Sequence, residues 1–329
     1  MTELRLGIVG CGAVAELYHL PAVAACPDVR LVGLADPRRE HAAELAERYG
    51  AELVTEDAAG LIDAVDAVVV ATPNSLHAEA AIELARAGVH VLVEKPLART
   101  TAECDAIADA VAAAGVVAAV GHDFRHFPVA RAARELLDLV GDVESAELLQ
   151  SAGGNWPHTS ADAFTRDRMG GGVLIDFGVH MLDLLGWWLG PLEVESYRDD
   201  AQGGVETECE LRLRTASGAE VLVELTRLRE MRDTTIVRAS RATVEIGIFE
   251  PALLRLGALS GDVPDPEFER APIRTVFVRQ LTDFAHAVHT GSPPAVSLAD
   301  GRRVVELVER AYAVREPLRR AWDWPEAYA

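Results

Sequence analysis

The sequence is poor in lysine and in long apolar runs. Lys95 is the only lysine among 31 basic residues, and 52 acidic residues bring the formal net charge to −21. A surface of this sign repels phosphate backbones and anionic lipid headgroups, so we expect neither a nucleic-acid partner nor attachment to a membrane. No apolar run approaches the about 20 residues that cross a bilayer. The N-terminal residues lack the layout of a signal peptide.

The cysteines are too few and too scattered for a disulfide framework. Cys11, Cys26, Cys104 and Cys209 form no C-x-x-C pair, and their spacing matches no zinc-binding pattern. We therefore expect no metal site and a reducing, cytoplasmic location. The remaining composition, 50% hydrophobic and 25% charged, is typical of globular proteins, and a length of 329 residues predicts two domains.

The first 120 residues alternate between short β-branched runs and stretches rich in Ala, Leu, Glu and Arg. This alternation predicts a parallel sheet covered by helices on both faces. The expected strands are Leu4–Val9, Leu31–Ala35, Ala67–Ala71, His90–Val93 and Val116–Val120. The expected helices are Ala13–Ala25, Arg39–Tyr49, Leu76–Ala87 and Thr101–Ala114.

The pattern changes after Gly121, which places a domain boundary near residue 122. Period-two alternation and short turns predict consecutive antiparallel strands, and a few amphipathic stretches predict helices, so the second domain is of the α+β class. The expected strands are Glu208–Arg214, Glu220–Leu228, Ile236–Ala239 and Ala242–Ile248. The expected helices are Val129–Val140, Val173–Leu189, Val278–His289 and Ala299–Glu316.

A glycine-rich turn follows the first expected strand. The residues from Gly10 to Ala15 fit G-x-G-x-x-A, where glycines allow a tight turn and close approach of a pyrophosphate, and the small third residue lets the helix pack on the strand. Asp36 ends the second strand about 20 residues later, as a ribose-binding acid should. A glycine turn with an unrelated exposed acid is the alternative. We predict that residues 1–122 form a dinucleotide-binding domain.

NAD is the expected cofactor, because a carboxylate at Asp36 accepts a ribose 2′-hydroxyl and repels a 2′-phosphate. Arg38 and Arg39 follow directly, and their guanidinium groups could accommodate that phosphate, so NADP stays possible. The contacts expected from this part of the chain are made by Gly10, Gly12, Ala13, Val14, Asp36 and Arg38.

Two further strands end in polar residues. Thr72-Pro73-Asn74 follows one of them, and Glu94-Lys95-Pro96 ends the next. The carboxyl ends of parallel strands face the ligand crevice, although a proline turn with a solvated lysine is the alternative. Since every other cation in the chain is an arginine, this position requires an amine. We expect cofactor contacts from Thr72, Asn74, His77, Glu94 and Lys95.

The segment from Gly170 to Asp183 joins three glycines to a mostly apolar helix. Asp176 and His180 are four residues apart and therefore share a helical face, which Asp183 borders. The glycines allow close approach to a neighbouring group. Buried ionisable groups need partners or a polar cavity, so this face is a candidate reaction site. A structural Asp/His pair inside the fold is the alternative.

Taken in order, these motifs resemble the glucose–fructose oxidoreductase/inositol dehydrogenase (Gfo/Idh/MocA) family over nearly the whole chain, as does the stretch Phe277–Phe284. The resemblance implies an N-terminal Rossmann domain with a doubly wound parallel sheet. It implies that residues 123–329 form a substrate-binding and oligomerisation domain with a large open, mainly antiparallel sheet. Members often form dimers or tetramers through that sheet. Most oxidise or reduce a secondary alcohol of a sugar or cyclitol with NAD(H) or NADP(H).

The resemblance also implies roles for single residues. Lys95 falls on the family's catalytic lysine, and Asp176 and His180 fall on its Asp-x-x-x-His pair. His180 is then the natural acid or base, Lys95 orients the hydroxyl and stabilises alkoxide character, and Asp176 positions the imidazole or the substrate. Which of Lys95 and His180 moves the proton stays open. The resemblance implies a cis peptide bond between Lys95 and Pro96.

Other polar residues near the motifs are candidates for contact with the substrate. Trp156 could stack on a sugar ring or pack between domains, and arginines could bind a carboxylate or phosphate. The expected substrate-binding set is Lys95, His122, Arg125, Trp156, Arg166, Asp176 and His180, with Asp123 beside His122. Two other functions stay open. One is an enzyme that retains NAD for net elimination, epimerisation or hydrolysis, and the other is a dinucleotide-binding sensor.

Overall fold

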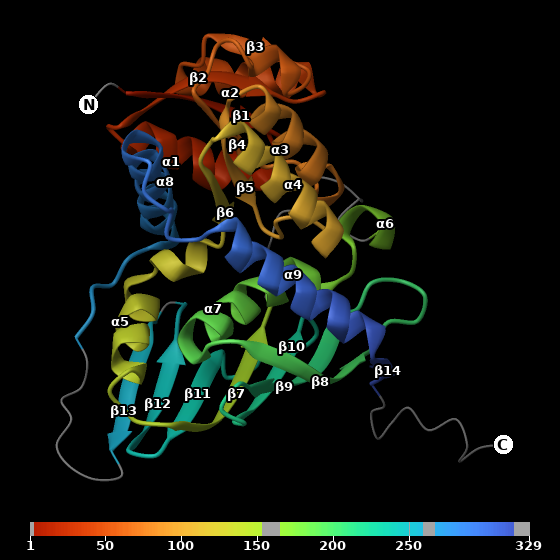
Figure 1. Cartoon of the computed structure of the whole chain (residues 1–329), viewed down its shortest axis with the longest axis vertical. Helices are drawn as coiled ribbons and strands as arrows, with labels where there is room; N and C mark the ends of the chain where they lie inside the picture. Colours follow the sequence, from red (N-terminus) through yellow and green to blue (C-terminus); the bar gives the residue numbers. More distant parts are fainter. Residues whose placement is uncertain (1–2, 153–164, 250, 259–266, 319–329) are drawn as a thin grey trace.

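The computed structural model describes residues 3–152, 165–249, 251–258 and 267–318, and these form two sheets with helices between and around them (Figure 1). The first sheet has six parallel strands in the order β3-β2-β1-β4-β5-β6. Its strands are β1 (Leu4–Val9), β2 (Val29–Ala35), β3 (Leu53–Thr55), β4 (Ala67–Val70), β5 (His90–Glu94) and β6 (Ala118–Gly121). All four residues of β4 are buried, as expected for a central strand covered on both faces.

The predicted alternation of strands and helices in this half is confirmed. The intervening elements are η1 (Ala15–His19), α1 (Leu20–Ala25), α2 (Arg39–Tyr49), η2 (Ala59–Leu61), η3 (Asn74–Leu76), α3 (His77–Arg86) and α4 (Thr101–Ala114). The helix expected from Ala13 to Ala25 begins as a wide π-turn in η1. The last strand begins at Ala118, two residues later than predicted, and β3 is a strand that the sequence pattern did not indicate.

The second sheet has eight strands in the order β13-β12-β11-β7-β10-β9-β8-β14. Most neighbours are antiparallel, as expected, but β10 runs parallel to β7 and β14 runs parallel to β8, so the sheet is mixed. Its strands are β7 (Val143–Ser151), β8 (Leu192–Asp199), β9 (Glu208–Thr215), β10 (Glu220–Thr226), β11 (Thr234–Ala239), β12 (Ala242–Gly247), β13 (Leu253–Ala258) and β14 (Arg315–Pro317).

Helices lie between this second sheet and the first (Figure 1). The remaining elements are η4 (Asp123–His126), α5 (Pro128–Leu137), α6 (Arg166–Met169), η6 (Leu174–Gly178), α7 (Val179–Leu189), α8 (Ile273–Thr290) and α9 (Leu298–Ala313). One face of the second sheet packs against α5, α7 and α9, whereas alternate side chains on the other face, such as Glu147, Leu222 and Ile236, stay partly exposed.

The C-terminal helices return to the first sheet. Leu281 and Phe284 of α8 are buried in the same cluster as residues of β1 and α1, and α8 lies beside α1 in Figure 1. The helix α9 contributes Val305 to a cluster of the first sheet and Val304 to the cluster of the second. We therefore keep residues 1–122 and 123–329 as a proposed division, with the addition that α8 and α9 pack across it.

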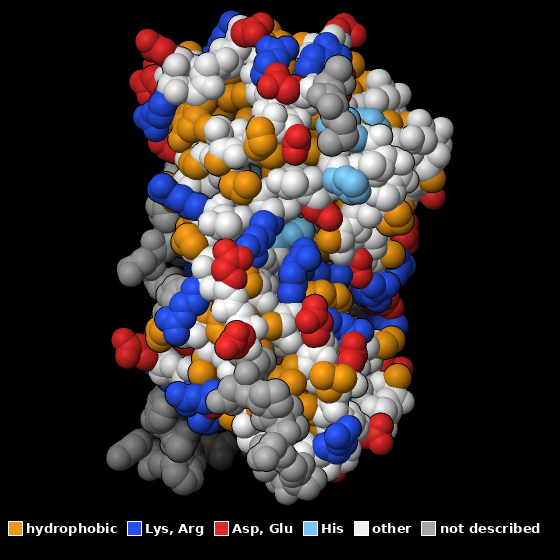
Figure 2. All heavy atoms as spheres, turned by 90° about the vertical axis from the view of Figure 1, so that its left-hand side faces the viewer, with side chains coloured by type: hydrophobic (Ala, Val, Ile, Leu, Met, Phe, Trp, Pro, Cys, Tyr) orange, Lys and Arg blue, Asp and Glu red, His pale blue; other side chains and the backbone are white. Residues whose placement is uncertain are grey.

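The surface carries charges of both signs. On the face shown in Figure 2, acidic and basic side chains are interspersed with apolar ones, so the excess of acid does not form a single continuous field there. No helix in the part of the chain described here is long and apolar enough to cross a membrane.

Candidate active site

The glycine-rich turn after β1 combines one closely packed glycine with one open glycine. Gly10 has φ +93°, and a Cβ there would lie 2.5 Å from the carbonyl oxygen of Ala71 at the end of β4. Gly12 differs, because a Cβ at that position would meet no atom within 4 Å. The turn therefore packs tightly on the sheet at Gly10 and leaves space above Gly12, where a dinucleotide phosphate would approach the backbone.

Asp36 follows β2 and is buried beside this turn. Its carboxylate accepts hydrogen bonds from the Cys11 main-chain N–H at 2.7 Å and from the Arg38 main-chain N–H at 2.8 Å. The Arg38 guanidinium also donates to it at 3.1 Å. Burial alone would raise the pKa of Asp36, but these hydrogen bonds bring that pKa below its usual value. Asp36 is thus an anionic acceptor held against the glycine turn.

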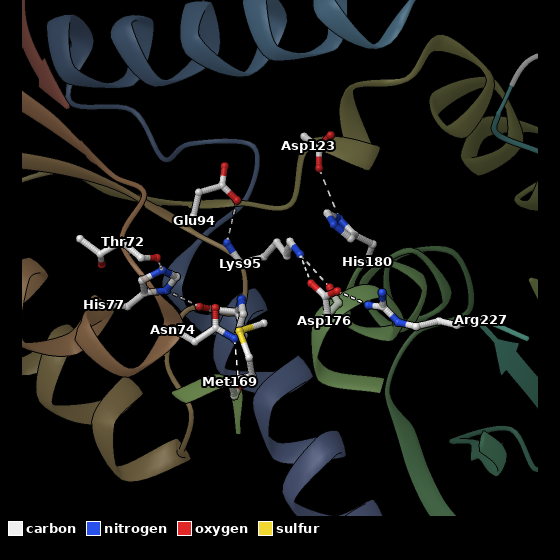
Figure 3. A network of polar contacts seen from close by, with 11 residues as sticks. Thr72, Asn74, His77, Glu94, Lys95, Asp123, Met169, Asp176, His180 and Arg227 are labelled. Atoms are coloured by element: carbon white, nitrogen blue, oxygen red, sulfur yellow. Dashed lines mark hydrogen bonds and ion pairs between the residues drawn. The ribbon is translucent and has the colours of Figure 1, made fainter. Parts of the chain in front are cut away.

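The residues after β4 mostly brace the backbone (Figure 3). Asn74 donates from Nδ2 to the carbonyl oxygen of Met169 at 3.0 Å and so ties η3 to α6. The two ring nitrogens of His77 each lie 2.8 Å from a main-chain carbonyl oxygen, one of Pro96 and one of Thr72. Only the buried hydroxyl of Thr72, among these three side chains, has no protein partner in the described residues.

Glu94 is the buried anion at the end of β5. Its Oε1 lies 2.7 Å from Nε2 of His19, and its Oε2 accepts the Lys95 main-chain N–H at 3.1 Å. Burial would raise the pKa of Glu94, but the contact with His19 and the charge of Lys95 bring it below its usual value. The His19 ring packs edge-on against Phe277 of α8 at 5.1 Å between centroids. This arrangement fixes the main chain from which Lys95 projects.

The Lys95 side chain reaches across to the second half of the chain. Its Nζ donates to the main-chain oxygen of Asp176 at 2.7 Å and lies 3.3 Å from the carboxylate Oδ1. The other carboxylate oxygen, Oδ2, pairs with the guanidinium of Arg227 (Figure 3). Burial would raise the pKa of Asp176, but Lys95 and Arg227 together lower it. The Lys95–Pro96 peptide bond is cis, as the resemblance implied.

His180 lies on the same side as Lys95 but has a different carboxyl partner. Its Nδ1 is 3.3 Å from Oδ1 of Asp123, without the alignment of a hydrogen bond, and its ring stacks on Phe124 at 4.0 Å. Burial, together with the charge of Lys95, lowers the pKa of His180 well below its usual value, and burial raises that of Asp123 well above it. Asp176 was expected to orient this imidazole or the substrate; its ion pairs are with Lys95 and Arg227 rather than with the His180 ring, and its role toward the substrate stays a prediction.

The glycine run before η6 is packed against the protein itself. A Cβ on Gly171 would overlap the hydroxyl of Tyr312 in α9, and one on Gly172 would overlap the main chain of Glu206. The Glu206 carboxyl accepts from the Tyr312 hydroxyl at 2.8 Å and from the Leu174 N–H at 3.1 Å. The close approach predicted from these glycines is therefore made to Tyr312 and Glu206 of the chain itself. This packing fixes the start of η6, the helical turn that contains Asp176.

Two of the residues expected to bind substrate, His122 and Arg125, have different surroundings in the structure. His122 is buried, neither of its ring nitrogens has a partner in the described residues, and its ring lies 6.3 Å from that of His180. Arg125 forms buried ion pairs with Asp183 at 2.6 Å and with Asp300 at 3.2 Å. Because its guanidinium is engaged within the protein, we leave Arg125 out of the proposed substrate site.

Of the other two candidates, the structure describes only Arg166. Arg166 is exposed and its guanidinium lies 5.5 Å from the centroid of the Tyr312 ring. Trp156 lies outside the described residues. Two contributors were missed by sequence reasoning, namely His19 and Arg227. Neither belongs to a motif, since His19 reaches Glu94 through the turn of η1 and Arg227 reaches Asp176 from the end of β10, so no local signal marks them.

The residues around the glycine turn fit a dinucleotide. The space above Gly12, the anionic Asp36 and the unpartnered Thr72 hydroxyl all lie at the carboxyl ends of β1, β2 and β4. Residues 4–122 match the family model described as "Oxidoreductase family, NAD-binding Rossmann fold", and residues 130–245 match that of the "GFO/IDH/MocA C-terminal domain". The chain belongs to the Gfo/Idh/MocA family.

Relatives within this family share most of their length with the chain. Levoglucosan dehydrogenase of Pseudarthrobacter phenanthrenivorans is 30% identical, and the alignment covers 94% of this chain and 88% of the relative. Inositol 2-dehydrogenase of Rhizobium meliloti is 27% identical over 94% and 96% of the two chains. A 3-ketoreductase from Actinomadura kijaniata, solved with NADP and TDP-benzene, superposes with a TM-score of 0.84 at 26% identity, covering 96% of this chain and 99% of that one.

Proposed function

We propose that this protein is an NAD(P)-dependent oxidoreductase that transfers a hydride between nicotinamide and a secondary alcohol or ketone of a sugar, sugar derivative or cyclitol. One observation carries the proposal. Lys95, directly after strand β5 of the dinucleotide-binding sheet, extends to the helical segment that carries Asp176 and His180, so an amine and an imidazole lie near each other where the two halves of the chain meet (Figure 3).

The residues divide the chemistry between them. Nicotinamide, when bound, supplies the hydride acceptor or donor. Removal of hydride from a carbinol carbon also requires loss of the hydroxyl proton, which a positioned side chain accepts. Lys95 would bind the hydroxyl oxygen and stabilise its developing negative charge. His180, neutral because burial lowers its pKa, would accept the proton, and Asp123 lies on the Nδ1 side of the ring.

The cofactor would be held by the first sheet. Gly10, Gly12, Ala13 and Val14 would cradle the pyrophosphate, and Asp36 would accept the ribose hydroxyls. The anionic state of Asp36 favours NAD, since its charge repels a 2′-phosphate. Arg38 is already bonded to Asp36, so accommodating NADP would require that contact to open.

The names of the relatives support the substrate class. One is a levoglucosan dehydrogenase, another is an inositol 2-dehydrogenase, and a third is a 3-ketoreductase solved with NADP and TDP-benzene. A levoglucosan dehydrogenase solved with NADH and levoglucosan also resembles the chain. Each name refers to a hydroxyl or keto group on a ring. Both directions of the reaction occur among these names, so we leave the direction for this chain to the experiment.

We further propose a cytoplasmic homodimer or homotetramer. The partly exposed face of the second sheet carries Leu149, Leu222 and Ile236 among charged residues, which suits pairing with a second copy. All four cysteines are buried and free, in keeping with a reducing compartment.

The test is a screen for hydride transfer. The purified enzyme is incubated with NAD or NADP and, separately, levoglucosan, myo-inositol or a methyl glucoside, and formation of the reduced nicotinamide is followed by absorbance. Substrate-dependent reduction with at least one ring alcohol supports the proposal. A nicotinamide that stays with the protein and never exchanges, together with a product of unchanged oxidation state, would replace it by the retained-cofactor alternative.

A further inference from the structure

Arg227 joins the second sheet to the proposed reaction site. It follows β10 directly, and its main-chain N–H donates to the carbonyl oxygen of Thr207 at 2.9 Å. Its guanidinium pairs with Oδ2 of Asp176, whose Oδ1 lies 3.3 Å from Lys95 Nζ (Figure 3). A continuous polar chain therefore runs from the first sheet, through η6, to the end of a strand in the second sheet.

The two cations hold the Asp176 carboxylate from opposite sides. A carboxylate bound by one flexible amine can rotate about its side-chain torsions, whereas a planar guanidinium anchored at a strand end restricts that rotation. The Arg227 and Lys95 side chains are each 20% exposed and Asp176 is 29% exposed, so the group is only partly screened by water. Lys95 and Arg227 are the charged groups that face Asp176 among the described residues.

A neighbouring arginine provides the contrast. Arg229, two residues further along, also forms carboxylate pairs, with Glu208 at 3.0 Å and with Glu224 at 3.4 Å. Its side chain is 45% exposed and touches none of Lys95, Asp176 or His180 in the described contacts. Ion pairs of arginines in this segment are therefore not confined to the proposed reaction site. Of the two arginines, Arg227 is the one that pairs with Asp176, the carboxylate that Lys95 also contacts.

We propose that Arg227 is a positioning residue for the hydride-transfer reaction: it fixes Asp176 so that Lys95 Nζ is held in one place beside His180. The proposal rests on the proposed function, because it assigns Arg227 a task within that reaction. Among the described residues, the ion-pair partner of the Arg227 side chain is Asp176. Arg227 acts through Asp176 alone, and it connects the geometry of the second sheet with the position of the amine.

The kinetic test compares Arg227→Gln with Arg229→Gln. Glutamine retains a donor and most of the length but removes the charge and the planar fork. In Arg227→Gln we expect kcat to fall by about tenfold to a hundredfold, because loss of orientation of a catalytic group costs rate, and KM to change by less than about threefold. Arg227→Lys should recover only part of kcat, and Arg229→Gln should match the wild type. Unaltered nucleotide binding and circular dichroism show that each variant is folded.

A second readout does not depend on turnover. Since the chain has one lysine, incorporation of [ε-13C]lysine gives a single side-chain NMR signal that reports on Lys95. In Arg227→Gln we expect the chemical shift of this signal to change. We also expect the pH at which the signal responds to protonation of Asp176 to be higher, because Arg227 is one of the two groups that lower the pKa of that carboxyl. Arg229→Gln should leave both unchanged.

The two readouts distinguish failure of the proposed function from failure of the inference about Arg227. If wild-type enzyme shows no hydride transfer but the Lys95 signal responds to Arg227→Gln as described, the proposed function fails and the positional link stands. If the wild type is active and Arg227→Gln matches Arg229→Gln in kcat and in the lysine signal, Arg227 has no positioning role and the inference is overturned.

Discussion

Replacement of Gly12 by alanine tests whether the space above the glycine turn is where a dinucleotide binds. A Cβ at position 12 would meet no protein atom within 4 Å, and Gly12 is not among the glycines with positive φ. The folded protein therefore accepts the methyl group without strain. We expect the free energy of unfolding to stay constant or to rise by about 0.4–1 kcal/mol, because alanine has less conformational freedom than glycine in the unfolded chain.

The same methyl group should obstruct the cofactor. Close approach of the pyrophosphate to the backbone is the reason that this position is glycine in the dinucleotide fingerprint. We expect the dissociation constant for NADH to rise at least about tenfold, a loss of about 1.4 kcal/mol of binding free energy. Stability and cofactor affinity thus change in opposite directions in one variant, which a general disturbance of the fold would not produce.

Gly172→Ala is the matched control. A Cβ there would overlap the main chain of Glu206, which is not the movable end of a side chain, so we expect unfolding to become easier by about 1–3 kcal/mol. Urea unfolding followed by circular dichroism gives the stability, and nicotinamide fluorescence gives the affinity. Wild-type NADH affinity in Gly12→Ala would refute the assignment of the turn to the cofactor.

Two further predictions concern charge. Asp36→Asn removes the anion that repels a 2′-phosphate, so the ratio of NADPH to NADH affinity should rise by about tenfold in fluorescence titrations, and an unchanged ratio would contradict the role of Asp36. Burial lowers the pKa of His122 and His180, and it lowers that of His126 from 6.5 to about 3. Because the unfolded chain binds these protons first, the contribution of His126 to stability should be lost as pH falls below 6.5, by about 2 kcal/mol at pH 5, whereas the raised pKa of Asp123 acts in the opposite direction. Thermal melting of the wild type and of His126→Gln at pH 7 and pH 5 isolates the contribution of His126, and an equal change of Tm in the two proteins would contradict the prediction.

The first sheet could be predicted because the hydrophobic pattern and the residue propensities of each segment favour the element that the segment forms. Its strands are continuous apolar runs, and its helices are rich in helix-forming residues. The second sheet was predicted less completely. The strand β7 reads Val-Glu-Ser-Ala-Glu-Leu-Leu-Gln-Ser, and its Glu, Ala and Leu residues favour a helix. Burial of Ala146, Leu148 and Gln150 on one face outweighs that propensity.

The site was predictable only where its residues belong to motifs. Lys95, Asp176 and His180 could be named together, but their pairing depends on how the two sheets meet. Asp176 and His180 share a helical face, yet one contacts Lys95 and the other contacts Asp123. Arg227 follows a strand end and lies 51 positions after Asp176 in the chain, and a contact over that separation leaves no periodicity or spacing in the sequence.

The most direct test of the central claim is the turnover of Lys95→Arg, measured with NADH affinity on the same sample. Arginine keeps the positive charge but cannot act as a compact amine. We expect kcat/KM on the ring alcohol to fall by about a hundredfold or more, as expected for loss of a group that stabilises the transition state, while NADH affinity changes much less, because Lys95 is only one of the expected cofactor contacts. Near-normal turnover in this variant would contradict the account. The reaction would then not depend on the amine of Lys95, on which its assignment to this site rests.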